Sequence, residues 1–232
     1  MVCKKLLLGR AFSYRLKFMK IHLFFCLFLS VFTAKLTFAD RGISSNVDFK
    51  IAFGSCGKQG HPLPIFDEVI KQDPHLFIFL GDNIYGDTND MDILHKKYQQ
   101  LGTKESYQHL IKNTEVLATW DDHDYGQNDA GKHYPHKVES KEIFLEFFKE
   151  PQNSERYKHK GIYHSVYKKA GNKIIQIILL DNRTFRDDLV RFPKGQKIPG
   201  RFFYRPDYLP HTDDSKAFLG EEQWSWLEGE LK

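Results

Sequence analysis

From residue 49 to residue 119, short apolar runs alternate with segments in which apolar residues recur at helical spacing. The short runs predict strands, because an unbroken apolar run of this length suits a strand that is covered on both faces. The spaced segments predict amphipathic helices. The predicted order is a strand at 49–53, a helix at 64–72, a strand at 75–80, helices at 90–101 and 104–111, and a strand at 115–119. We expect the helix at 64–72 to bury Ile65, Phe66, Val69 and Ile70 on one face.

The pattern changes in the second half of the chain. Two strand-like runs at 161–167 and 173–180 flank Ala170-Gly171-Asn172, which predicts a β-hairpin because Gly and Asn tolerate the positive φ angles of a tight turn. Residues 184–215 show no periodicity and predict a long surface loop. Helices are predicted on either side of these elements, at 138–149 with Val138, Phe144, Leu145 and Phe148 facing inward, and at 221–231 with Trp224 and Leu227 facing inward.

This order of elements predicts an α/β fold, in which helices flank a mostly parallel sheet and a β-hairpin lies beside it. Residues 40–232 are enough for one ordinary domain with a core of its own.

The first 39 residues contain seven Lys or Arg residues and no acid. A short apolar run from Ile21 to Ala34 follows the basic start, and Thr37-Phe38-Ala39 places small residues at the −3 and −1 positions of a cleavage site. This predicts a signal peptide at 1–39, with Met19 as an alternative start and Sec-type export to the periplasm or the exterior. An uncleaved membrane anchor is the alternative. Removing seven charges from the net charge of +4 leaves −3, so we expect no nucleic-acid partner. Cleavage also removes the apolar run, so we expect no stable membrane span in the mature chain.

The stretch Thr119–Asp129 concentrates aspartates, an imidazole, a phenol and two amides directly after the strand predicted at 115–119. Like charges this dense repel each other, so they belong either to a solvated acidic loop or to the surroundings of a cation. The position favours the cation, because open α/β folds bind their ligands at the carboxyl ends of strands. On its own, the stretch leaves both interpretations open.

Other reactive side chains follow the other predicted strands, namely Cys56, then Asp82 and Tyr85, and finally Asp181 and Arg183. Thiolate, phenolate and carboxylate together suit a hard, highly charged ion such as ferric iron, whereas carboxylate and amide oxygens suit calcium or magnesium. Arg183 is a natural bidentate partner for a phosphate, and we expect Asp181 to be a structural acid that orients it. Cys56 has no internal disulfide partner in the mature chain. Four interpretations are open for it: a buried hydrophobic residue, a free thiol, an intermolecular disulfide or a metal ligand.

Four of these segments resemble, in order, successive signatures of the PhoD-like alkaline phosphatase family, a group of metallophosphatases. They are Phe53-Gly54-Ser55-Cys56, Gly81-Asp82-Asn83-Ile84-Tyr85, Thr119-Trp120-Asp121-Asp122-His123-Asp124 and Leu180-Asp181-Asn182-Arg183. The resemblance covers roughly residues 48–232 and implies the hydrolysis of phosphate mono- or diesters by an iron–calcium cluster, in an αββα sandwich that is incomplete here.

On the family pattern, Cys56, Asp82 and Tyr85 resemble iron ligands, with Asp82 placed to bridge to calcium, and Asn128 resembles a calcium ligand. Asp121, Asp122 and His123 cannot all bind metal, so at least one of them is expected to orient a ligand instead. The site set that we expect comprises Cys56, Asp82, Tyr85, Asn128 and Asp122 as metal ligands, and Asp121, His123 and Arg183 in catalysis. His123 is either a proton donor or a structural histidine. The histidines His133, His136, His159 and His164 lack ligand spacing and are expected to be ordinary surface or loop residues.

The family pattern continues with a Gly-Asp-x-His segment that completes the metal centre, and this sequence has no such segment. We therefore expect a C-terminally truncated domain, whose missing part could be supplied by a partner chain. The alternatives are a non-catalytic remnant that binds metal or phosphate weakly, and a membrane-anchored calcium-binding module. The physiological phosphate ester is not specified by the sequence.

Overall fold

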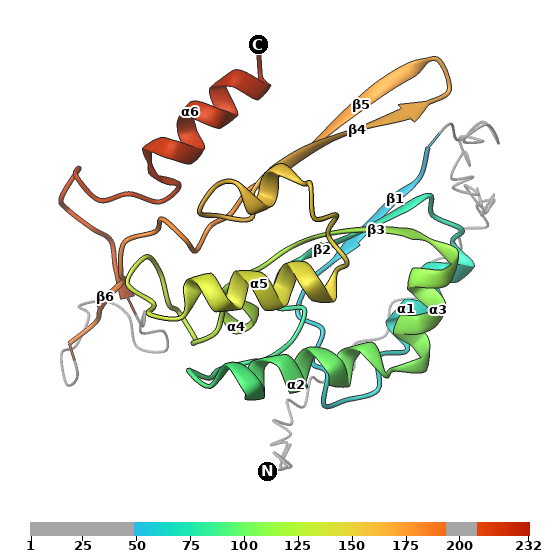
Figure 1. The fold of residues 1–232 in the computed structure, drawn as a ribbon, viewed down its shortest axis with the longest axis horizontal. Coiled ribbons are helices and arrows are strands. Elements are labelled where there is room, and N and C mark those ends of the chain that lie inside the picture. The colour runs from blue at the N-terminus through green and yellow to red at the C-terminus, as the bar shows by residue number, and fades with distance from the viewer. Residues whose placement is uncertain (1–48, 194–207) are drawn as a thin grey trace, which may run out of the picture. The chain divides into compact units, whose positions relative to one another are not determined.

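The computed structural model of the protein describes residues 49–193 and 208–232 (Figure 1). The predicted signal peptide at 1–39, with its alternative start at Met19, lies outside the described residues, as does part of the predicted loop at 184–215. None of the helices described has the length and apolar character that crossing a bilayer requires.

A three-stranded parallel sheet supports the first half of the fold. Its strands are β1 (Ile51–Gly54), β2 (Leu76–Leu80) and β3 (Glu115–Thr119), in the order β1-β2-β3. The connecting helices are α1 (Ile65–Lys71), α2 (Met91–Gly102) and α3 (Glu105–Asn113). The predicted parallel sheet is thus confirmed, and the carboxyl ends of all three strands meet at one edge.

The central strand β2 packs a different layer against each of its faces. Phe77 and Phe79 point to the helical side, where both rings contact Phe66 of α1 edge-on at 6.0 and 5.8 Å. Leu76 and Ile78 point to the opposite side, where they form a second apolar cluster with Ile177 and Leu179 of the hairpin strand β5. Burial on both faces explains why β2 is an unbroken apolar run.

The hairpin consists of β4 (His164–Ala170) and β5 (Lys173–Leu179), paired antiparallel as predicted. The hairpin contacts α6 (Gly220–Glu230) through Gln176 of β5, which hydrogen-bonds to the main chain and the side chain of Glu230. The rings of Tyr163 and Trp226 lie 4.7 Å apart and extend this contact. The sheet therefore has helices on one face and the hairpin on the other, and α6 lies to the left of the hairpin in Figure 1.

The remaining elements are α5 (Lys137–Phe147), which packs with α2 on the helical face of the sheet, and several short elements. The short elements are α4 (Asp122–Tyr125), a 3-10 helix at Glu155–Tyr157, and the two-residue strands β6 (Val190–Arg191) and β7 (Tyr208–Leu209), which pair with each other.

Several expectations about buried residues were wrong. Trp224 is 49% exposed, because Gln223 takes the inward position in α6 and exchanges hydrogen bonds with the main chain of Asp181. Val138 in the first turn of α5 and Ile65 at the start of α1 are 61% and 60% exposed. The buried apolar residues of α5 are Phe144 and Leu145 in later turns, and α1 buries the neighbouring Phe66. His164 is not a surface or loop residue: it lies in β4, where burial above all lowers its pKa to about 3.

Candidate metal centre

The loops that follow β1 and β2 are joined by main-chain hydrogen bonds. The N–H groups of Cys56 and Gly57 donate to the carbonyl groups of Gly81 and Asp82, at 3.2 and 2.8 Å. Gly81 adopts a φ of 105°, and a Cβ atom there would lie 2.6 Å from the Cβ and N atoms of Asp121. Only glycine fits this position, and its small size lets the β2 and β3 loops approach each other closely.

Asp124 is the buried acid that fixes the relation between these two loops. Its carboxylate accepts the N–H groups of Asp82 and Asn83 at 3.2 and 3.1 Å, and the N–H of Asp121 at 2.6 Å. The side-chain amide of Asn83 also donates to it, at 2.5 Å. Burial raises the pKa of the Asp124 carboxyl well above its usual range, while the N–H donors from Asp121 and Asn83 oppose that shift. The donors hold the loops around one side chain, so Asp124 positions the site.

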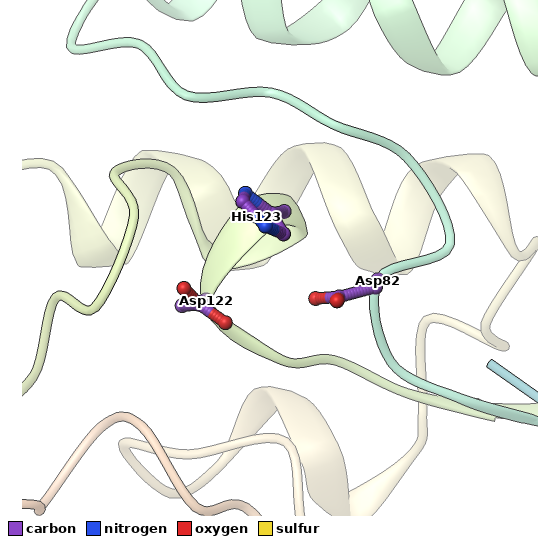
Figure 2. A group of neighbouring side chains, drawn as sticks. All are labelled: Asp82, Asp122 and His123. Carbon is purple, nitrogen blue, oxygen red and sulfur yellow. The ribbon is translucent and has the colours of Figure 1, made fainter. Parts of the chain in front are cut away.

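Asp82, Asp122 and His123 each present a metal-binding atom, and these atoms all lie within 4.8 Å of one another. Figure 2 shows the Asp82 carboxylate pointing from the β2 loop toward Asp122 and His123, which come from α4. Asp82 adopts a φ of 52°, a left-handed conformation that aims its side chain at the other loop. Its Oδ1 atom is buried without a hydrogen-bond partner. Burial raises the pKa of Asp82, His123 opposes that shift, and the charges of Asp121 and Asp122 add to it.

His123 is held by an acid that the sequence did not single out. Its Nδ1 atom lies 2.6 Å from Oδ1 of Asp87, which leaves Nε2 as the ring nitrogen without this contact. Burial lowers the pKa of His123, but the hydrogen bond and the charge of Asp87, together with the charges of Asp122 and Asp82, outweigh it, so the net shift is upward. The Asp87 contact therefore fixes the ring and favours its protonated form.

Cys56 and Tyr85 flank the cluster on the β1 and β2 loops. Cys56 is an exposed free thiol, which rules out the buried-hydrophobe interpretation, and its Sγ atom lies 3.6 Å from Oδ2 of Asp82. The Tyr85 ring lies 4.2 Å from the ring of His123. Burial, followed by the charges of Cys56 and Asp82, raises the pKa of Tyr85 to about 12. Three anion-forming groups side by side are costly without a cation, so the arrangement suits one.

Arg183 joins the hairpin side to the same cluster. Its Nε atom donates to Oδ1 of Asp121 at 2.5 Å, one Nη contacts the same oxygen, and that nitrogen lies 3.5 Å from Oδ1 of Asp122. The other Nη is buried without a hydrogen-bond partner. Asp121 therefore orients the guanidinium, and the second Nη of Arg183 keeps hydrogen-bond donors that no described residue accepts.

Asp181 is fully buried, as expected of a structural acid. Its two oxygens accept N–H groups of Trp120, Ile162, Arg183 and Thr184, and also the Thr184 hydroxyl, at 2.6 to 3.0 Å. The bond to the main chain of Arg183 ties the position of that residue to Trp120, at the start of the acidic stretch.

Asn128 is the least connected of the predicted ligands. It is exposed, and its amide donates to Oδ2 of Asp129 at 2.6 Å. The main chain of Asp129 in turn donates to Oδ2 of Asp122 at 2.7 Å, so Asn128 is tied to the cluster through its neighbour.

The structure thus gathers Cys56, Asp82, Tyr85, Asp121, Asp122, His123 and Arg183 at the carboxyl edge of the sheet and places Asn128 beside them. Sequence reasoning missed Asp87 and the anchoring role of Asp124. Asp87 follows Gly86 in the β2 loop, which also carries Asp82 and Tyr85. Its position in that loop could have indicated that it belongs to the site.

Comparison with solved structures finds one described as "Structure of PhoD", with a TM-score of 0.55 and 19% sequence identity. The match covers 79% of this chain and 39% of the solved chain, so this protein spans well under half of that structure. At this identity the likeness shows the fold. No curated protein sequence matches the chain. The family model for the PhoD-like phosphatase matches residues 51–232, which include every residue of the site described above. The chain therefore belongs to the PhoD-like phosphatase family.

Proposed function

We propose that the protein is an exported, metal-dependent phosphohydrolase that cleaves phosphate mono- or diesters at the cluster around Asp82. The observation that carries this proposal is the environment of Asp82. Its backbone adopts a left-handed conformation, one carboxylate oxygen is buried without a partner, and Asp122 and His123 lie within metal-binding reach. Left-handed backbone at a non-glycine residue and an unpaired buried oxygen both cost free energy, and such costs cluster where a ligand offsets them.

The donor set fits the cations that the family resemblance implies. Cys56, Asp82 and Tyr85 would hold ferric iron, because a hard trivalent ion favours thiolate, carboxylate and phenolate in their charged forms. Asp122 and Asn128 would hold calcium through carboxylate and amide oxygens, with Asp82 shared between the two ions. When bound, the cations supply Lewis-acid stabilisation of the charge on the phosphate oxygens.

The protein's own side chains would orient the ester and move a proton. The free Nη of Arg183 would donate to a phosphate oxygen, while Asp121 holds the guanidinium in place. His123 would carry a proton at Nε2 for the leaving oxygen, because Asp87 holds Nδ1 and raises the pKa of the ring.

The test is to purify the chain, measure bound iron and calcium, and assay p-nitrophenyl phosphate and bis(p-nitrophenyl) phosphate. We expect bound metal and turnover of at least one ester. The Cys56→Ser variant should lose iron before calcium, because the Cys56 thiolate is proposed to bind the iron, whereas calcium binds oxygen ligands. Asp67→Asn, which changes an acid of α1 that has no recorded contact to the site, is the matched control.

Each outcome separates the proposal from its rival. Metal binding without turnover of either ester supports a non-catalytic protein that binds metal or phosphate. A folded sample with neither metal nor turnover contradicts the catalytic proposal for this chain. Export is tested separately by the mass of the protein recovered outside the cytoplasm, which should correspond to a chain that begins near Asp40.

A further inference from the structure

A cavity with an apolar lining and several basic side chains around it lies outside the metal centre. It has a volume of about 720 Å³ and is bordered by the start of α5, the 3-10 helix, the segment Thr184–Phe185 and the start of α6. Six of its lining residues are basic or titrate to a cation, namely Lys132, His133, Lys137, Lys141, His159 and Lys160. None of the described residues that line it is acidic. A cavity of this size is typical of sites that enclose a small organic molecule.

Three of these side chains already have acidic partners just outside the cavity. Lys132 pairs with Asp187 at 2.6 Å, Lys160 with Glu222 at 3.7 Å, and His133 with Asp188 at 2.7 Å. Their charges are therefore largely balanced, and they do not by themselves call for a ligand.

Lys137 and Lys141 are different, because neither has an acidic partner among the residues that the structure describes. The Lys137 ammonium donates to the carbonyl of Lys132 at 2.6 Å, and the Lys141 ammonium donates to the carbonyl of His159. Each ammonium group has three N–H donors, so each can donate further hydrogen bonds besides the one to a main-chain carbonyl. Lys137 and Lys141 are four positions apart in α5 and so lie on the same face, where two like charges repel.

Lys141 is the more constrained of the two. It is only 9% exposed, and burial together with the nearby charge of Arg156 lowers its pKa, although the charges of Asp181, Glu222 and Glu142 oppose that shift. The charges of these three acids offset the cost of this buried ammonium only in part, because its pKa is lowered on balance, and an anion in the cavity would offset more of that cost. The apolar walls formed by Val138, Tyr157 and Phe185 would contact a non-polar body attached to that anion.

We propose that this cavity binds an organic anion, a phosphate or carboxylate group on an apolar body, through the ammonium groups of Lys137 and Lys141. The site is independent of the proposed hydrolysis, since none of its lining residues belongs to the metal cluster. Binding can therefore be measured with all metal removed by a chelator.

The test is calorimetric titration of the full chain, in the presence of EDTA, with 2-naphthyl phosphate, 2-naphthoate and the neutral 2-naphthol. We expect one-to-one binding of at least one anion, about tenfold or more tighter than 2-naphthol and weaker as ionic strength rises. Tighter binding of the phosphate than of the carboxylate would identify a phosphorylated ligand, and the reverse order would identify a carboxylate ligand.

Variants locate the site. Lys137→Gln should weaken anion binding by about tenfold, and Val138→Glu, which adds a negative charge beside the two ammonium groups, should weaken it further. The matched control is Lys96→Gln on α2, an exposed lysine outside the cavity, which should bind as the unchanged protein does. Lys141 is buried, so a Lys141→Gln variant can fail to fold; the Lys137→Gln variant tests the proposal without it. Anions that bind no better than 2-naphthol, or equal binding by the Lys137→Gln and unchanged proteins, would overturn the proposal.

Discussion

The aspartates at the carboxyl edge of the sheet fall into two groups with opposite surroundings. Asp124 and Asp181 are fully buried, and each accepts hydrogen bonds from several N–H groups of different loops. Asp82 differs from both, because one of its oxygens is buried with no donor, and a ligand atom each of Asp122 and His123 lies within 4.8 Å of its carboxylate.

This difference shows that the donors aimed at a carboxylate decide its role, more than its place in an acidic motif does. A carboxylate surrounded by N–H groups is complete and stabilises the loops that supply them. One surrounded by other anions is incomplete and gains most from a cation. The two groups are linked, because Asp124 accepts the main-chain N–H of Asp82 and so holds the incomplete acid in position.

The largest effect is expected when a complete acid is removed. Asp181→Ala would leave buried donors of Trp120, Ile162 and Thr184 without an acceptor, so the free energy of unfolding should fall by roughly 3–5 kcal/mol. Urea unfolding monitored by circular dichroism measures it. Asp92→Ala, at an exposed first-turn position of α2, is the control and should change stability by about 0.5 kcal/mol or less. A loss for Asp181→Ala as small as that of the control would erase the distinction between the two groups.

Removing the incomplete acid should affect metal binding and leave the fold intact. Asp82→Asn retains a residue type that tolerates the left-handed backbone, and it should lower metal affinity by about 100-fold. The pKa of Asp82 is raised in the folded state, so its carboxyl costs stability as pH rises through that raised value. In EDTA at neutral pH the variant should therefore be as stable as the unchanged protein, or slightly more stable. Chelator competition and urea unfolding give the two values, and a large loss of stability in EDTA would place Asp82 with the structural acids.

A third acid, Asp187, also accepts hydrogen bonds, and its contribution to stability can be followed by changing the pH. The hydrogen bond from Lys132, followed by the N–H of Ala217, lowers the pKa of Asp187 to about 2. Its folded pKa lies below the ordinary value, so its contribution is present above about pH 4 and disappears between about pH 4 and pH 2. Asp187→Asn should cost roughly 1 kcal/mol at neutral pH, a value that allows for solvent screening of the Lys132 pair. Urea unfolding as a function of pH should show the two proteins converging as the pH falls, and a constant difference would contradict this assignment.

Much of the fold could be predicted from the sequence, because the spacing of apolar residues predicts both the type of each element and the face that it buries. The run Leu76–Leu80 predicted a strand covered on both faces, and β2 is buried between the helices and the hairpin. Trp224 shows where that reasoning fails. Its hydrophobicity predicts that it faces inward. However, the buried N–H and carbonyl groups of Asp181 need hydrogen-bond partners, and Gln223 supplies them by taking the inward position.

The candidate site could be predicted as a set of strand ends but not as a division of roles. The order of motifs indicated that Cys56, Asp82 and Asp122 approach one another, because parallel strands share an edge. It could not show that Asp124, two residues after Asp122, points inward to collect N–H groups while Asp122 faces the cluster. That division depends on the short helix α4 and on the left-handed turns at Gly81 and Asp82, neither of which has a periodic signal.

The smallest expected effect concerns Asp87, which belongs to neither group because its partner is an imidazole. Burial alone would lower the pKa of His123, and the contact with Asp87 is the first-ranked of the influences that raise it, ahead of the charges of Asp122 and Asp82, so Asp87→Asn should lower the pKa of His123. NMR titration of the histidine Cε1 protons follows this directly, and its readout does not depend on activity. Asp90→Asn, at the cap of α2, is the matched control because Asn also accepts the N–H of the next turn. An unchanged His123 titration in Asp87→Asn would mean that Asp82 and Asp122 set its charge, which would place His123 within the electrostatics of the metal cluster.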